Sequence, residues 1–151
     1  MEHKPLVELQ AIADVRFAET QTPMTREQRL ARWIGLLEAD PERELRSLHE
    51  IEHLSASDRR ACRSDESPLS VAYHDRILRL SGLKSDRVGV CTDFFGLTDD
   101  QMHHAFCSCH TGVKLTGAEA AARLRAVVDR HNAHPSSGGL WQTLRRIFRA
   151  A

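Results

Sequence analysis

The chain has 151 residues, of which 41% are hydrophobic and 28% charged, a composition typical of one globular domain rather than a disordered segment. Basic and acidic residues both number 21, so the charge balance gives no reason to expect nucleic-acid binding. No apolar run approaches the roughly 20 residues of a membrane span, and no signal-peptide pattern is present. We therefore expect a cytosolic protein whose 4 cysteines are reduced.

Helix signals recur along the chain, and no segment shows the sustained alternation of a strand. Thr25 with Gln28, Thr98 with Gln101, and Thr116 with Glu119 each fit a capping box. Ser67 followed by Pro68 is typical of a helix start. These signals and the apolar spacing predict helices over 5–19, 25–39, 41–54, 57–63, 68–81, 86–95, 99–110, 117–131 and 139–150. The sequence predicts an all-α protein, a compact bundle of about seven or eight helices.

The stretch 132–139, NAHPSSGG, is the clearest linker, because proline and glycine break helices and serine adds flexibility. It divides the chain into a single helical domain at 1–135 and a linker with a hinged amphipathic helix at 136–151. That last helix presents a basic face and an apolar face.

The run His49-Glu50-Ile51-Glu52-His53 is a literal H-E-x-x-H motif. On a helix its two histidines face one zinc ion while Glu50 activates the bound water, as in zinc-dependent hydrolases. The candidates for a third ligand are Asp58, Glu66 and His74. Glu52 would place a charge beside a buried site, which favours the alternative of a charged helix face with both histidines in solvent.

The segment 99–112, DDQMHHAFCSCHTG, concentrates histidine and cysteine. On one continuous helix, Cys109 shares the core face with Met102, Ala105 and Phe106. The opposite face carries a row of three potential ligands for zinc or copper, namely His103, Cys107 and His110. The candidates for a fourth ligand are Cys62, His74 and Cys91.

Two alternatives stand beside a metal at this segment. The first is a half-exposed helix face that binds nothing, and the second is a reactive Cys107 tuned by the neighbouring imidazoles. Haem attachment is excluded, because a C-x-x-C-H motif would need cysteine where Phe106 stands. Cys107 and Cys109 would hold one ion together only if the helix ended before Cys109. The expected cofactor is therefore either none or a zinc or copper ion.

The C-terminal helix is the third candidate site, with arginines opposite an apolar face. It suits a groove on a protein partner, a second copy of the chain or an anionic membrane surface, and it could also close the protein's own core. We expect a regulatory or adaptor module that binds a partner here rather than an enzyme. The residues expected to make this contact are Leu140, Trp141, Leu144, Arg145, Ile147 and Phe148.

Overall fold

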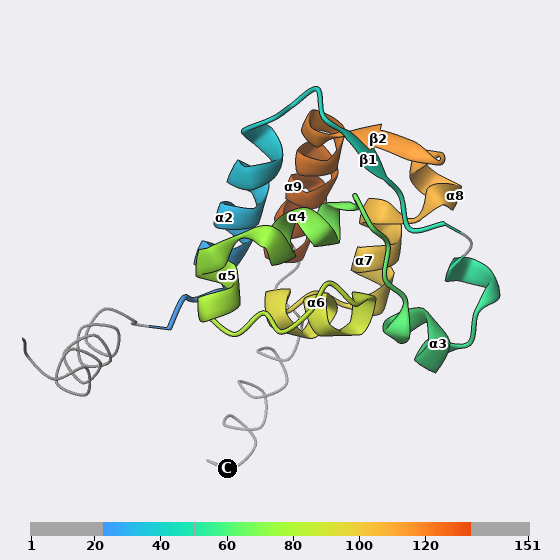
Figure 1. Ribbon diagram of the computed structural model, residues 1–151, viewed down its shortest axis with the longest axis horizontal. Coiled ribbons are helices and arrows are strands. Elements are labelled where there is room, and N and C mark those ends of the chain that lie inside the picture. The colour runs from blue at the N-terminus through green and yellow to red at the C-terminus, as the bar shows by residue number, and fades with distance from the viewer. Residues whose placement is uncertain (1–22, 50, 134–151) are drawn as a thin grey trace, which may run out of the picture.

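The computed structural model describes residues 23–49 and 51–133 (Figure 1). This part is mostly helical, as predicted, and also holds a small two-stranded sheet that the sequence did not indicate. The predicted helices over 5–19 and 139–150, most of the linker and all the expected partner-binding side chains lie outside the described residues. Among the described helices, none is both long enough and apolar enough to cross a membrane.

The described elements are short and closely spaced along the chain. The helices are α2 (Arg26–Glu38), α3 (Ala56–Ala61), α4 (Pro68–His74), α5 (Arg76–Leu80), α6 (Val88–Phe95), α7 (Asp99–Phe106), α8 (Ser108–Thr111) and α9 (Gly117–Ala133). The remaining elements are the 3-10 helix η1 (Ile51–His53) and the antiparallel strands β1 (Glu44–Arg46) and β2 (Lys114–Thr116).

The predicted capping boxes are confirmed. Thr98 Oγ1 accepts a hydrogen bond from the Gln101 amide at 3.1 Å, and Gln101 Oε1 accepts one from the Thr98 amide at 2.9 Å. The same reciprocal pair forms at Thr25 before α2, and Thr116 and Glu119 form it at the start of α9. Each box satisfies amide groups that a helix start would otherwise leave without partners.

The core forms around Trp33 of α2, which is fully buried. Its ring stacks on Phe95 of α6 with centroids 4.2 Å apart and lies 5.4 Å from Phe106 of α7. The indole N–H donates to the Pro68 carbonyl at 2.9 Å, so the buried polar atom has a partner. Trp33 thus joins its own helix α2 to α4, α6 and α7, and it packs against the last residue of α7, Phe106, directly before Cys107.

Helices α2 and α9 lie side by side (Figure 1). Gly117 begins α9 against the backbone that follows α2, and its amide donates to the Arg43 carbonyl at 3.0 Å. A Cβ atom at Gly117 would lie 2.3 Å from the Asp40 carbonyl oxygen and 2.6 Å from that of Leu37. Only glycine permits this approach, which places α9 beside α8, where Arg123 donates to the His110 carbonyl.

Three predicted helices differ from the structure, and two of them, 41–54 and 68–81, lie outside the segment 99–112. The segment 41–54 is not a helix, because β1 pairs with β2 and places Leu45 opposite Leu115, both buried. The segment 68–81 is divided at Asp75, whose extended backbone ends α4 and whose side chain caps α5 at the Leu78 amide. In both places a tertiary or capping contact overrides a local helical pattern.

Candidate metal centre

The predicted helix over 99–110 is interrupted at Cys107. Its backbone is extended, with φ −71° and ψ 139°, so α7 ends at Phe106 and α8 begins at Ser108. The interruption reverses the expected orientation of the two cysteines. Cys107 is fully buried, whereas Cys109, expected in the core, is exposed. Because the helix ends before Cys109, the condition for two cysteines on one ion is met.

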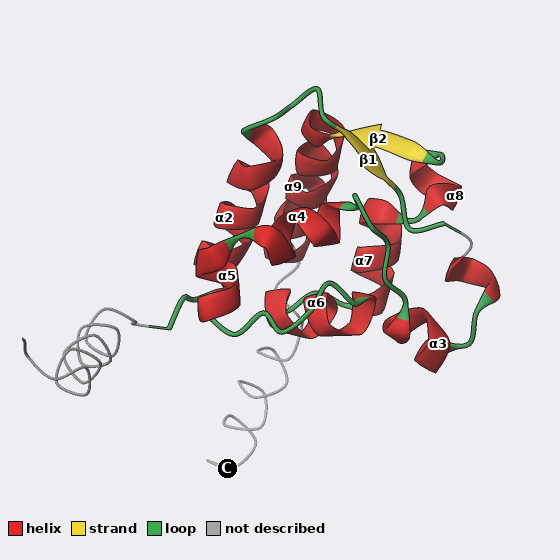
Figure 2. Ribbon diagram, in the orientation of Figure 1, coloured by secondary structure: helices red, strands yellow, loops and turns green. Residues whose placement is uncertain are grey.

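Leu48 holds the backbone at this break. Its amide donates to the Phe106 carbonyl at 2.8 Å, and its carbonyl accepts from the Ser108 amide at 3.0 Å. These two bonds form a parallel bridge between Leu48 and Cys107 (Figure 2 shows this segment passing beside α7 and α8). The chain then enters η1, where buried Ile51 anchors the turn and brings Glu52 back towards Cys107.

Four side chains meet at this point, with ligand atoms all within 4.8 Å of one another: Glu52, His103, Cys107 and Cys109. The Cys107 thiol donates to Glu52 Oε2 at 3.1 Å, and the Cys109 thiol donates to Cys107 Sγ at 3.1 Å. His103 Nε2 lies 3.6 Å from Cys109 Sγ. We call these residues the four-ligand group.

Burial and hydrogen bonding keep the inner thiol protonated while no metal is bound. Burial raises the pKa of Cys107 to about 12 from an ordinary 9.0. The Cys109 backbone N–H opposes this shift, whereas the side chains of Cys109 and Glu52 add to it. The pKa of Glu52 is lowered, first by its own backbone N–H and then by the Cys107 thiol. A carboxylate therefore faces a thiol, an arrangement that a cation can enter by displacing the thiol protons.

A second group of imidazoles adjoins the first and shares His103 with it, the other members being His104 and His110. His104 Nδ1 and His110 Nε2 share a hydrogen bond of 3.1 Å, and the His110 carbonyl accepts from Arg123 of α9 at 2.8 Å. Loss of water contact lowers the pKa of His110, and the positive charges of His104, His103 and Arg123 lower it further. The lowered pKa favours the neutral ring of His110, and the neutral imidazole is the form that binds metals.

The predicted row of His103, Cys107 and His110 is therefore divided between two groups. His103 and Cys107 belong to the four-ligand group, whereas His110 joins His103 among the imidazoles. Sequence reasoning missed Glu52 as a candidate ligand, and it named Cys109 as a ligand beside Cys107 only if the helix ended before it. The C-x-C spacing was the signal for Cys109, but Glu52 lies far along the chain and carried no such signal. Neither group includes the suggested fourth ligands, Cys62, His74 and Cys91.

The H-E-x-x-H motif does not form the helix that its chemistry requires. His49 follows a β-bridge, His53 ends the 3-10 helix η1, and Glu50 lies outside the described residues. Both histidines are exposed, and His49 shares a hydrogen bond of 3.2 Å with Ser108 Oγ. Among the described residues, the groups able to hold a metal include neither His49 nor His53.

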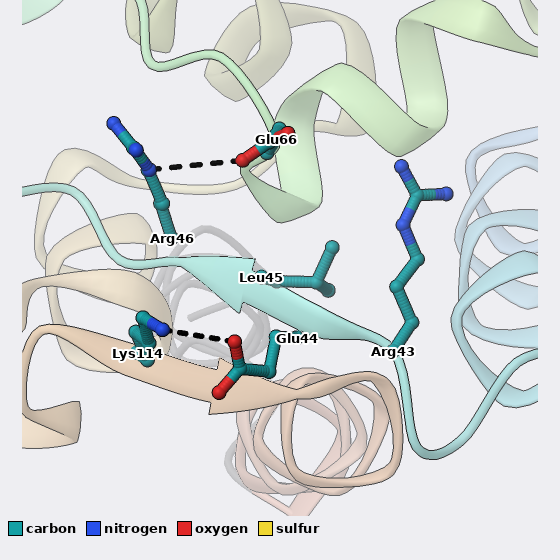
Figure 3. A pocket seen from close by; sticks show the side chains of 6 residues that line it. All are labelled: Arg43, Glu44, Leu45, Arg46, Glu66 and Lys114. Atoms are coloured by element: carbon teal, nitrogen blue, oxygen red, sulfur yellow. Dashed lines mark hydrogen bonds and ion pairs between the residues drawn. The ribbon is translucent and has the colours of Figure 1, made fainter.

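A separate polar hollow of about 290 Å³ lies beside β1. Arg46 points towards Glu66, 3.7 Å away, and Lys114 towards Glu44 at 2.8 Å (Figure 3). Glu66 has a left-handed backbone, with φ 59°. The hollow is lined by Arg43, Glu44, Leu45, Arg46, Glu66 and Lys114. Both carboxylates already pair with cationic side chains, and the lining contains neither thiol nor imidazole. The hollow is therefore a weaker candidate for a metal or catalytic site than the four-ligand group.

The four-ligand group contains the ligand types found at zinc sites. Zinc bonds of about 2.0–2.3 Å in a tetrahedron place the ligand atoms about 3.3–3.8 Å apart. Three of the six ligand–ligand distances in the group are 3.1 to 3.6 Å, and none exceeds 4.8 Å, so side-chain shifts of up to about 1 Å would admit the ion. Two thiolates with imidazole favour zinc over magnesium or calcium.

No protein family, curated protein or solved structure matches this sequence.

Proposed function

We propose that the protein is a small regulatory module whose four-ligand group, Glu52, His103, Cys107 and Cys109, binds one zinc ion. The observation that carries this proposal is the convergence of the four ligand atoms within 4.8 Å of one another. Two thiolates, one carboxylate and one neutral imidazole supply the charge and the donor types that zinc prefers.

A regulatory role fits this ligand set better than catalysis. Catalytic zinc keeps one position open for water, whereas four protein ligands close the coordination sphere. The ion would join Glu52 of η1 to the junction of α7 and α8. These two segments are far apart in the sequence. Binding would therefore fix the position of η1, and the bound form would present a different surface from the metal-free form.

A partner-binding role is part of the same proposal. Leu54 directly follows η1 and is 38% exposed, while Val113 lies between α8 and β2 and is 62% exposed. Large apolar side chains on segments adjoining the metal site are suitable contacts for a protein partner. The C-terminal helix, with Trp141 and Phe148, stays the predicted main contact. We place the module in the cytosol, where free cysteines remain reduced.

Native mass spectrometry of the full chain, reduced, stripped of metal and then supplied with zinc, tests the proposal. We expect one zinc ion per chain and its loss in Cys107→Ser, Cys109→Ser and Glu52→Gln. The matched control is Cys62→Ser, since Cys62 is half-buried and belongs to neither group. Zinc that survives Cys109→Ser but is lost in His49→Ala would reject the proposal and restore the hydrolase motif.

A thermal measurement supplies a second criterion. A ligand that binds only the folded state stabilises it by about 2.7 kcal/mol at a free concentration of about 100 times its dissociation constant. We expect zinc to raise the melting temperature of the wild type and of Cys62→Ser, but not of Cys107→Ser. Equal melting temperatures with and without zinc in the wild type would count against the site.

A further inference from the structure

The two cysteines of the four-ligand group also form a close pair of unequal exposure. Their sulfur atoms lie 3.1 Å apart, and both thiols are free. Cys107 is fully buried, while Cys109, on the first turn of α8, is exposed. A small reagent from solvent therefore reaches Cys109 first and finds Cys107 directly behind it.

A side chain able to take up a proton lies beside each thiol. His103 Nε2 lies 3.6 Å from Cys109 Sγ, and Glu52 Oε2 accepts the Cys107 thiol hydrogen bond at 3.1 Å. A nucleophile beside a base, with a second thiol in contact with the first, is the arrangement of a redox-sensitive cysteine and its resolving partner.

We propose that Cys109 and Cys107 are a modification site for hydroperoxides, in which Cys109 reacts first and Cys107 resolves the product as a disulfide. The accompanying loss of zinc rests on the proposed function, whereas the disulfide itself does not. Hydrogen peroxide and small organic hydroperoxides are the chemical class of oxidant, since the exposed sulfur admits small reagents.

The reaction balances in two steps. The Cys109 thiol proton passes to His103, the sulfur attacks the terminal peroxide oxygen, and the O–O bond breaks. The proton returns from His103 to the departing oxygen, which leaves as an alcohol or water and leaves Cys109 as a sulfenic acid. Cys107 sulfur then attacks Cys109 sulfur and displaces hydroxide, which becomes water with the Cys107 proton transferred through Glu52. In total, the two thiols lose two electrons as they form the disulfide, and one hydroperoxide accepts them.

Oxidation would remove two of the four zinc ligands at once. Thiolates bind zinc, and disulfide sulfurs have no such charge to offer. The remaining Glu52 and His103 are too few to hold the ion, so hydroperoxide would release zinc and free η1 from the junction of α7 and α8. The module would then report oxidant through the same conformational change that zinc controls.

The test uses the full chain without metal, in chelator, so that its first part is independent of zinc. Treatment with one equivalent of hydrogen peroxide should remove two alkylatable thiols and two hydrogen atoms from the intact mass. Peptide mapping should place the disulfide between Cys107 and Cys109, with Cys62 and Cys91 still free. Unchanged thiol content, or loss of Cys62 or Cys91 thiols instead, would overturn the proposal.

Single substitutions separate the two roles. Cys107→Ser should stop at a sulfenic acid on Cys109, which a dimedone probe labels, and Cys109→Ser should lose both the label and the disulfide. Cys62→Ser is the matched control and should oxidise like the wild type. Dimedone labelling of Cys107 in Cys109→Ser, as strong as that of Cys109 in Cys107→Ser, would contradict the assigned order.

A final experiment compares zinc binding by the reduced and the oxidised protein, and its outcomes distinguish failure of the metal site from failure of the modification site. Reduced protein should bind one zinc ion, oxidised protein none, and a thiol reductant should restore binding. Disulfide formation without zinc binding in the reduced protein would reject the metal site and leave the modification site standing. Zinc binding that persists after complete oxidation would reject the proposed coupling.

Discussion

Zinc affinity should rise steeply with pH, because zinc binds the thiolate of Cys107 and must displace its proton. The pKa of this buried thiol is about 12, so the metal-free protein keeps the proton across the neutral range. Each zinc ion therefore releases one proton from Cys107. Because of this one released proton, the dissociation constant for zinc falls about tenfold for each unit by which the pH rises, or about 100-fold between about pH 6 and pH 8.

Competition with a chromophoric chelator at about pH 6, 7 and 8 measures this dependence. The plot of log affinity against pH for the wild type should rise by at least about one for each pH unit, whereas Cys107→Ser should show no zinc binding at any of the three pH values. Cys62→Ser controls for loss of a cysteine and should give the wild-type slope. A wild-type affinity that does not change with pH, or zinc binding by Cys107→Ser with the wild-type slope, would refute the assignment of Cys107 as a ligand.

Two further outcomes concern stability. Gly117→Ala should lower the free energy of unfolding by about 1–3 kcal/mol in urea titrations, because its Cβ would overlap two backbone carbonyls; Gly35→Ala, with nothing within 4 Å, should be neutral or stabilising. In metal-free protein, Cys91 and Cys107 hold their protons to about pH 12, whereas unfolded thiols lose them near 9.0. The contribution of these two thiols to the free energy of unfolding should be fully present below pH 9 and should be lost as the pH rises towards 12. A free energy of unfolding that stays constant over this range would contradict the burial of the two thiols.

Local signals in the sequence were sufficient to predict most helix ends. Thr25 and Thr98 cap their helices through residues three positions ahead, so the pattern and the contact lie within one turn. Gly96 ends α6 in a left-handed conformation with φ 61°, again a local property. The mostly helical architecture was predictable because these contacts do not depend on the rest of the fold.

The geometry of the candidate site was not predictable in this way. Neither glycine nor proline marks the break at Cys107; backbone bonds to Leu48, distant in sequence, accompany it. Glu52 reaches Cys107 only because β1 and η1 replace the helix that the H-E-x-x-H motif suggested. The local pattern identified His103 and Cys107 as ligand types, but tertiary pairing decides which side chains meet.

X-ray absorption at the zinc edge of the zinc-loaded full chain tests the central claim most directly, because it reports the atoms bound to the ion. The four-ligand group predicts two sulfur ligands at about 2.3 Å and two nitrogen or oxygen ligands at about 2.0–2.2 Å. A shell of nitrogen and oxygen alone would contradict a site built on Cys107 and Cys109.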